Sequence, residues 1–221
     1  TTMLVGEGGS PAPQNEKTLA DAGPGADSVI TWRTYREYFA LLESRGIALN
    51  VVHNVGAAQV RLAVIGEEGR APTPDELAQM KALVRAAMED GAIGLSTALL
   101  YPPGTYATTD ELIELARVAA EYGGVYFSHM RNESNQLLEA IQEVIAIAQE
   151  AGIPGHIYHL KAAGQENWPL MSRALALIAD ARRLGRDITA DIYPYIRNGI
   201  GLGSFLHPRH YVQGDEAFRA R

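Results

Sequence analysis

Two neighbouring stretches, GGVYFSHMRNES (123–134) and GIPGHIYHLKAAG (152–164), decide the fold. In each, a short apolar run typical of a buried strand leads to a histidine, His129 in the first and His159 in the second. The segment between them, 135–152, has the spacing of a helix. Two strands joined in this way are parallel neighbours, and their carboxyl ends meet at one edge of the sheet. The sequence therefore predicts that the two histidines converge.

Outward from these stretches, strands and helices alternate along most of the chain. One helix start is clearly marked, because Thr73 can cap it, Pro74 takes the first helical position and Glu76 completes a capping box. The segment 10–28 is rich in Pro, Gly and polar residues and is predicted to be a loop. The predicted strands are 1–9, 47–56, 92–101, 125–130, 156–161 and 187–195, and the predicted helices are 31–46, 70–91, 107–124, 135–152 and 168–185.

This alternation favours a parallel sheet, either an open doubly wound sheet or a (β/α)8 barrel. The glycines of GEGGS (6–10) lack the G-x-G-x-x-G spacing of a dinucleotide site. Polar residues instead follow nearly every strand, which is where barrel enzymes keep their active sites. We therefore expect an incomplete α/β barrel of the TIM type with about six of its eight strands. Residues 1–221 are then one part of a single barrel domain, without its first strand and its C-terminal part.

Composition excludes several classes of function. The 221 residues are 47% hydrophobic and carry a net charge of −7, so nucleic acid is not an expected partner. No run of about 18 apolar residues predicts a membrane span. The stretch TTMLVGEGGS (1–10) has no basic region before its apolar run and does not resemble a signal peptide. The chain has no cysteine, which excludes disulfides and thiolate metal ligands within it.

Two imidazoles at equivalent strand ends form half of a site for a divalent metal such as zinc. The alternative is that His129 and His159 are core or rim histidines bonded to the backbone. His207 and His210 lie in a loop-like segment and are candidates only for a substrate lid.

Four other polar residues have more ordinary expected roles. His53 ends a strand without a partner at metal spacing, so a structural role is expected. Strand alternation turns His156 to the face opposite His159, against the helices. Arg131 and Glu133 are expected to pair with each other or with nearby loops.

Four segments in this order carry a family resemblance: GAIGLSTALLYPPGTYATTDELIELARVAAEYGGVYFSHMRNES (91–134), LLEAIQEVIAIAQEAGIP (137–154), HLKAAGQENW (159–168) and ITADIYPY (188–195). Together they resemble the N-acyl-D-amino-acid deacylases, or D-aminoacylases, of the amidohydrolase superfamily. The resemblance covers the chain from about Thr1 to Tyr195. It implies a metal-dependent barrel that hydrolyses the amide of an N-acylated D-amino acid, a small-molecule substrate, and needs the rest of the same polypeptide to close.

The resemblance also implies how substrate is held. Lys161 and Tyr101 match the family groups that contact the substrate α-carboxylate. Tyr193 matches the catalytic tyrosine that polarises the scissile carbonyl, with Tyr195 as the alternative. A cation and a phenol suit a carboxylate, and a hydrogen-bond donor suits a developing oxyanion.

For the metal, His129 and His159 match the histidines that bind one tightly held zinc ion, and a second ion is left open. The family's H-x-H, its late catalytic aspartate and its bridging cysteine have no counterpart here. The turn that carries that cysteine reads VGEGGSP (5–11), and AIGLSTALL (92–100) has no lysine that could serve as a carboxylated bridge. By elimination Glu7 is the expected third ligand, since a carboxylate binds zinc well; the alternative is a solvated turn residue.

Three functions follow as hypotheses. The first is hydrolysis of N-acyl-D-amino acids. The second is another amidohydrolase reaction, by a dipeptidase or a cyclic-amide hydrolase, in which Lys161 and Tyr101 hold a different anion. The third is a non-catalytic barrel fragment. Activity on D- against L-substrates distinguishes the first two hypotheses.

Overall fold

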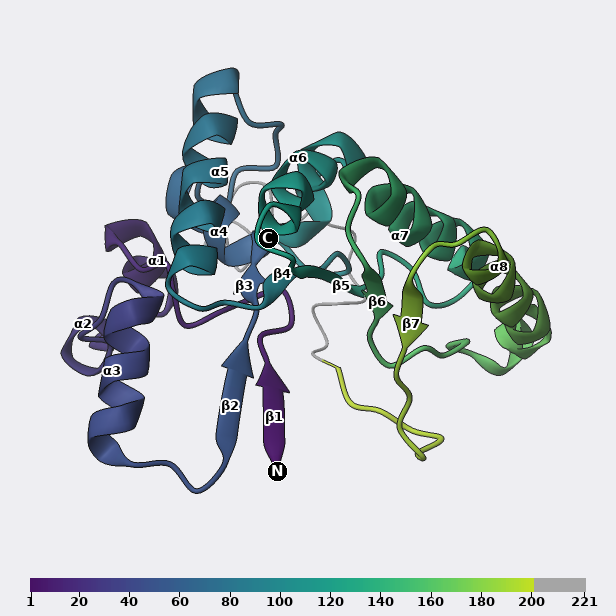
Figure 1. The fold of residues 1–221 in the computed structure, drawn as a ribbon, viewed down its shortest axis with the longest axis horizontal. Helices are drawn as coiled ribbons and strands as arrows, with labels where there is room; N and C mark the ends of the chain where they lie inside the picture. Colours follow the sequence, from purple (N-terminus) through teal and green to yellow (C-terminus); the bar gives the residue numbers. More distant parts are fainter. Residues whose placement is uncertain (201–221) are drawn as a thin grey trace, which may run out of the picture.

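Parallel strands and covering helices alternate along residues 1–200, the part of the chain that the computed structural model describes (Figure 1). The strands are β1 (Thr2–Val5), β2 (Asn50–His53), β3 (Val55–Gly56), β4 (Gly94–Ala98), β5 (Val125–His129), β6 (Gly155–Ile157) and β7 (Ile188–Ala190). The α-helices are α1 (Glu16–Asp21), α2 (Ala26–Val29), α3 (Tyr35–Arg45), α4 (Ala57–Val64), α5 (Pro74–Glu89), α6 (Thr109–Ala120), α7 (Leu137–Ala151) and α8 (Met171–Arg183). Two 3-10 segments, η1 (Gly104–Tyr106) and η2 (Gln165–Leu170), complete the chain order.

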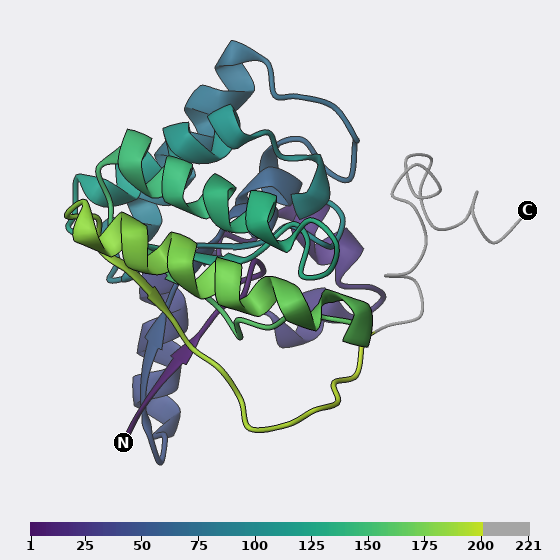
Figure 2. The same ribbon diagram turned by 90° about the vertical axis from the view of Figure 1, so that its right-hand side faces the viewer.

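Among the described residues, every strand pairing is parallel and joins neighbours in the chain. One ladder is β1–β2 and the other runs β3–β4–β5–β6–β7 in sequence order. The helices α4 to α8 arch over one side of these strands, and Figure 2 shows α7 and α8 side by side on that outer layer. This is the arrangement of consecutive βα units in a barrel. The predicted class is therefore confirmed, since the chain forms part of a TIM-type barrel.

The predicted strand 47–56 is divided in two at Asn54, which is fully buried. Its backbone N–H donates to Val5 O at 3.1 Å, and its carbonyl accepts from the Tyr35 hydroxyl at 2.5 Å. Its side-chain amide donates to the Tyr158 hydroxyl at 2.8 Å. Buried polar groups need such partners, and these three bonds tie β1, α3 and the end of β6 to one point.

The marked helix start at Thr73 is as predicted. Thr73 caps α5 by accepting from the Glu76 N–H, Glu76 reaches back in a capping box, and Pro74 is the first helical residue. The predicted loop 10–28 is wrong in part, because α1 and most of α2 lie within it. Asn15 starts α1 through a capping box with Thr18, so a short helix forms within this loop-like composition. The helix α4 has no counterpart in the prediction.

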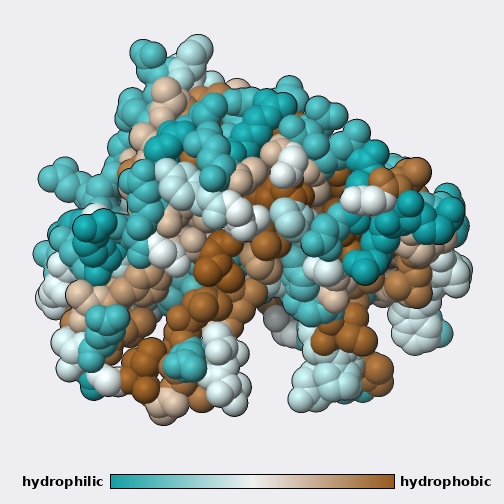
Figure 3. Space-filling model, in the orientation of Figure 1, coloured by the Kyte–Doolittle hydropathy of each residue, from teal (hydrophilic) through white to brown (hydrophobic). Residues whose placement is uncertain are grey.

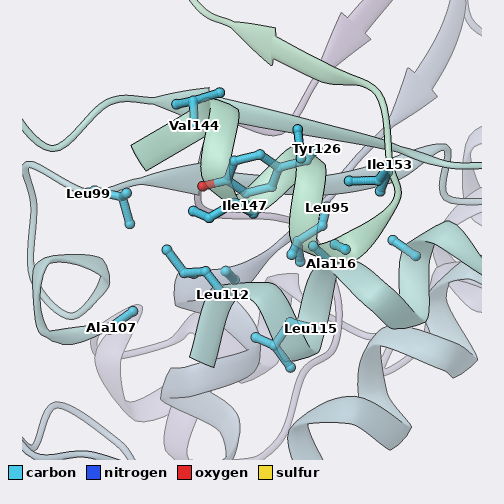
Figure 4. Close-up of a cluster of buried hydrophobic side chains, with 14 of the residues drawn as sticks. Leu95, Leu99, Ala107, Leu112, Leu115, Ala116, Tyr126, Val144, Ile147 and Ile153 are labelled. Atoms are coloured by element: carbon cyan, nitrogen blue, oxygen red, sulfur yellow. The ribbon is translucent and has the colours of Figure 1, made fainter. Parts of the chain in front are cut away.

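The core lies between the strands and the outer helices. Figure 4 shows Tyr126 of β5 among side chains of β4, α6 and α7, all of them buried. Leu95, Leu112, Leu115 and Ile147 in this group are 0% exposed. Alternate residues of a strand face opposite sides, so burying Tyr126 against the helices turns Phe127 and His129 to the inner face. The register of β5 thereby directs His129 toward the inside of the barrel.

The outermost strands have open edges in the described residues. There β1 pairs only with β2, and β7 pairs only with β6. Apolar side chains are exposed near both, with Met3 at 43% and Ile192 at 76% exposure. Figure 3 shows this apolar surface along the projecting β1–β2 lobe and again across a notch from it. Within residues 1–200, no helix has the length and apolar character needed to cross a membrane.

Candidate metal centre

A tight glycine turn after β1 carries Glu7. Gly8 has φ of +74°, a conformation that side chains rarely adopt, and a Cβ on it would lie 2.4 Å from the Ala98 Cβ. Its N–H donates to Ser96 Oγ at 3.2 Å. Only glycine allows this close approach to β4. The turn therefore holds the Glu7 carboxylate at the carboxyl end of the neighbouring strands.

Glu7, His129 and His159 converge on one point. Glu7 Oε1 lies 2.7 Å from His129 Nδ1 and 3.0 Å from His159 Nε2. The three possible ligand atoms lie within 4.8 Å of one another, and the two imidazole rings are 4.5 Å apart at 83°. One carboxylate oxygen and two imidazole nitrogens are a donor set that zinc prefers. The two imidazole rings thus converge, as the sequence predicted.

The electrostatics of this cluster suit a cation. Hydrogen bonds from His129 and His159 hold the pKa of Glu7 well below its usual range. Burial disfavours a charged His159, but hydrogen bonds to Glu133 and Glu7 outweigh it and raise the pKa of His159 to about 9. His129 is 5% exposed, and its Nε2 has no partner among the described residues. The ring is therefore held by its contacts with Glu7, His159 and Tyr101.

His159 reaches the cluster because its strand ends early. The predicted strand 156–161 stops at Ile157, and His159 has φ of 37°, which is unusual for a residue other than glycine. The Asp191 carboxylate accepts from the His159 N–H at 2.5 Å. Strain of this kind persists only where surrounding contacts impose it. Asp191 therefore fixes the backbone that presents the His159 ring.

The same break overturns the expectation for His156. It pairs with Phe127 in the ladder, on the inner face, and its ring lies 5.7 Å from that of Tyr158. His156 Nδ1 lies 2.7 Å from Thr189 Oγ1, and Nε2 lies 2.9 Å from Asp191 Oδ2. The alternation rule fails here because the backbone leaves the strand before His159. His156 therefore supports Asp191 instead of packing on the helices.

The expected substrate-binding groups surround the cluster. The Lys161 ammonium lies 5.7 Å from the centre of the Tyr193 ring, and the Tyr101 ring lies 5.3 Å from that of His129. The Tyr193 ring lies 6.4 Å from that of His159, whereas the alternative, Tyr195, is 72% exposed. Burial raises the pKa of Tyr193, so its phenol keeps its proton and can donate a hydrogen bond.

Arg131 and Glu133 do not pair with each other, contrary to one of the two expectations. Arg131 pairs with Glu143 at 2.9 Å and donates to two carbonyl oxygens of the loop that carries Tyr101, at 3.1 and 2.9 Å. Glu133 instead lies 2.5 Å from Lys161 Nζ and 2.9 Å from His159 Nδ1. Sequence reasoning missed this contact with His159. The only signal for it was an acidic residue four positions after His129, too common a feature to carry a role.

One cavity of about 830 Å³ collects these residues. Its lining includes all six residues singled out from the sequence and the resemblance: Glu7, Tyr101, His129, His159, Lys161 and Tyr193. Cavities of 300 to 1,000 Å³ suit small-molecule ligands. The lining thus combines metal-ligand chemistry with a cation and two phenols.

The remaining histidines do not reach this cavity in the described residues. His53 packs among Tyr35, Tyr38 and Phe39, with ring centres 5.1 to 6.2 Å away. Burial lowers the pKa of His53 to about 4, so the ring is neutral near pH 7, which agrees with its expected structural role. His207 and His210 lie outside the described residues.

No protein-family model matches the chain. The D-aminoacylase of Alcaligenes xylosoxydans xylosoxydans is 37% identical over 204 residues, which are 89% of this chain and 41% of that protein. A crystal structure of D-aminoacylase, described as defining a novel subset of amidohydrolases, superposes with a TM-score of 0.80 at 35% identity. That match covers 89% of this chain and 42% of the other.

A second solved structure is the N-acyl-D-glutamate deacylase of Bordetella bronchiseptica, complexed with zinc and a phosphonate mimic of the tetrahedral intermediate. It superposes with a TM-score of 0.77 at 37% identity, over 88% of this chain and 42% of the other. This chain therefore spans less than half the length of these relatives. Within that span, the identities and the shared barrel topology confirm the resemblance, and the chain belongs to the D-aminoacylase family.

Proposed function

We propose that residues 1–221 form part of a metal-dependent amidohydrolase barrel that hydrolyses N-acyl-D-amino acids to a carboxylic acid and a D-amino acid. The observation that carries the proposal is the single cavity in which Glu7, His129 and His159 face Lys161, Tyr101 and Tyr193. The relatives of this chain named D-aminoacylase and N-acyl-D-glutamate deacylase support the choice of substrate. The rest of the same polypeptide closes the barrel in this proposal.

In this proposal Glu7, His129 and His159 hold one zinc ion, because their ligand atoms already converge. A bound zinc ion supplies an activated water and polarises the amide carbonyl. Tyr193 donates a hydrogen bond from its protonated phenol to the carbonyl oxygen, which stabilises the charge that develops there during attack.

Lys161 and Tyr101 orient the substrate through its α-carboxylate. The Lys161 ammonium offers donors on the cavity side of the metal cluster, and a charge-assisted bond to a carboxylate is stronger than a neutral one. With the carboxylate and the scissile carbonyl both fixed, the position of the side chain depends on the configuration of the α-carbon. This two-point attachment accounts for a preference between D- and L-substrates.

The intact protein that contains this chain is expected to hydrolyse N-acetyl-D-leucine or N-acetyl-D-glutamate at least about 100-fold more efficiently than the L-enantiomers. Release of the free amino acid measures the reaction, and chelation of the metal should abolish it. Another amidohydrolase activity would be favoured by either of two results. One is comparable turnover of the D- and L-enantiomers, and the other is faster cleavage of a dipeptide or a cyclic amide than of any of these N-acetyl amino acids.

Replacing Lys161 by methionine should raise KM for these substrates by roughly 10- to 100-fold, because one charge-assisted bond to the α-carboxylate is lost. The zinc content should stay at the parent level, since Lys161 is not a ligand. Steady-state kinetics and metal analysis of the same preparations check both parts. The corresponding N-acyl amino amides lack the carboxylate, so their hydrolysis should change little, and an equal loss on both substrates would contradict this role.

A further inference from the structure

Three groups that line the cavity meet beside the ring of His159. Lys161 Nζ lies 2.5 Å from Glu133 Oε1 and 2.7 Å from His159 Nδ1. His159 Nδ1 in turn lies 2.9 Å from the same Glu133 oxygen. The side chains of Glu133 and Lys161 are only 10% and 18% exposed, so water competes little for these contacts. The ammonium, the carboxylate and the ring nitrogen therefore form a closed triangle.

Hydrogen-bond chemistry allows only one useful arrangement of this triangle. An ammonium has donors and no acceptor, and an ionised carboxylate only accepts. If Lys161 donated to His159 Nδ1, that nitrogen would need its lone pair, and the neutral ring would carry its proton on Nε2. Nε2 is the atom that faces Glu7 at 3.0 Å, where a metal ligand must have its lone pair free. The Lys161–His159 contact is thus incompatible with ligation by a neutral His159.

The Glu133 carboxylate resolves this conflict. It can accept from both Lys161 and His159 Nδ1–H, which places the imidazole proton away from the metal side. The carboxylate is itself held by its turn, since Asn132 Oδ1 accepts from the backbone N–H of Ser134 at 2.8 Å and of Gln136 at 3.1 Å. The Glu133 carbonyl also accepts from the Ala163 N–H at 2.7 Å, beyond β6.

We propose that Glu133 is a positioning residue that keeps His159 in the Nδ1–H form and draws the Lys161 ammonium away from that ring. It thereby separates the carboxylate-binding lysine from the metal ligand, although the two side chains are two residues apart in the sequence. This inference rests on the proposed function, because it assigns His159 to a metal and Lys161 to a substrate carboxylate.

The test is a set of zinc titrations of the metal-free intact protein against a chromophoric chelator. Glu133→Ala should weaken zinc binding by about 10- to 100-fold, the range seen when the partner of a ligating histidine is lost. Glu133→Gln should stay within about fivefold of the parent, because the amide oxygen still accepts from the ring. Glu139→Gln, on the exposed face of α7, is the matched control and should change nothing.

The double variant decides between positioning and simple loss of structure. Adding Lys161→Met to Glu133→Ala removes the competing donor, so zinc affinity should recover part of what the single variant lost. The inference would be overturned if Glu133→Ala bound zinc with the parent affinity. It would also be overturned if the double variant bound zinc no more tightly than Glu133→Ala. If the parent protein itself binds no zinc at this site, the proposed function fails instead, so the two failures are distinguishable.

Discussion

Glu7→Gln is expected to lower zinc affinity by more than about 100-fold and to reduce deacylation in proportion to the metal lost, with the fold intact. Removing a group that only supports a metal ligand typically weakens metal binding by about 10- to 100-fold. Removing Glu7, which is a proposed ligand itself, should weaken it more. Its oxygen lies 2.7 and 3.0 Å from the two ring nitrogens, and it brings the only negative charge of the three-residue set. Glutamine keeps the shape of the side chain but removes that charge.

The change should be local, because the turn depends on glycine geometry and on the hydrogen bond from the Gly8 N–H to the Ser96 hydroxyl. Circular dichroism and the unfolding temperature should therefore match the parent with metal removed from both. Glu16→Gln, at the exposed start of α1, serves as the control for loss of one acidic group near the N-terminus. Parent-level zinc content and turnover in Glu7→Gln would return Glu7 to the alternative of a solvated turn residue.

That His129 and His159 lie at the same end of the sheet was predictable from chain order, because parallel neighbours joined by a helix bring their carboxyl ends together whatever the side chains are. That the His159 ring also turns toward His129 depends on the early end of β6, which the sequence did not predict. Glu7 was identified as the third candidate ligand only by elimination, from the family pattern. The structure adds the reason that it can reach the site, which is the left-handed Gly8 turn against Ala98.

The parts that the sequence did not predict depend on where strands stop. His156 was assigned to the wrong face because alternation holds only while the strand continues, and this strand ends at Ile157. The contact between Glu133 and His159 joins segments on either side of α7 and follows from the fold of two loops, not from spacing. Asn54 divides a strand through three tertiary hydrogen bonds, which no local pattern encodes.

Residues 1–221 expressed alone are expected neither to unfold cooperatively nor to hydrolyse N-acyl-D-amino acids. In the described part of the chain, β1 and β7 each pair on one side only, and apolar residues such as Met3 and Ile192 are exposed beside them. Unpaired edges next to apolar surface favour association with other chains. A closed barrel has no unpaired strand edges. This chain matches only about 41% of the length of the D-aminoacylase relative, so the strands that would close the barrel are expected elsewhere in the longer polypeptide that we propose.

The experiment compares residues 1–221 with the same chain inside the longer polypeptide that we propose. For the isolated segment we expect aggregation on size-exclusion chromatography, a broad thermal transition and no release of D-amino acid. A folded but inactive monomer would contradict the expected instability while leaving open that further ligands lie beyond this chain. A soluble monomer that unfolds cooperatively and deacylates N-acetyl-D-leucine would contradict both, because Glu7, His129 and His159 would then suffice for the metal and the open edges would not need covering.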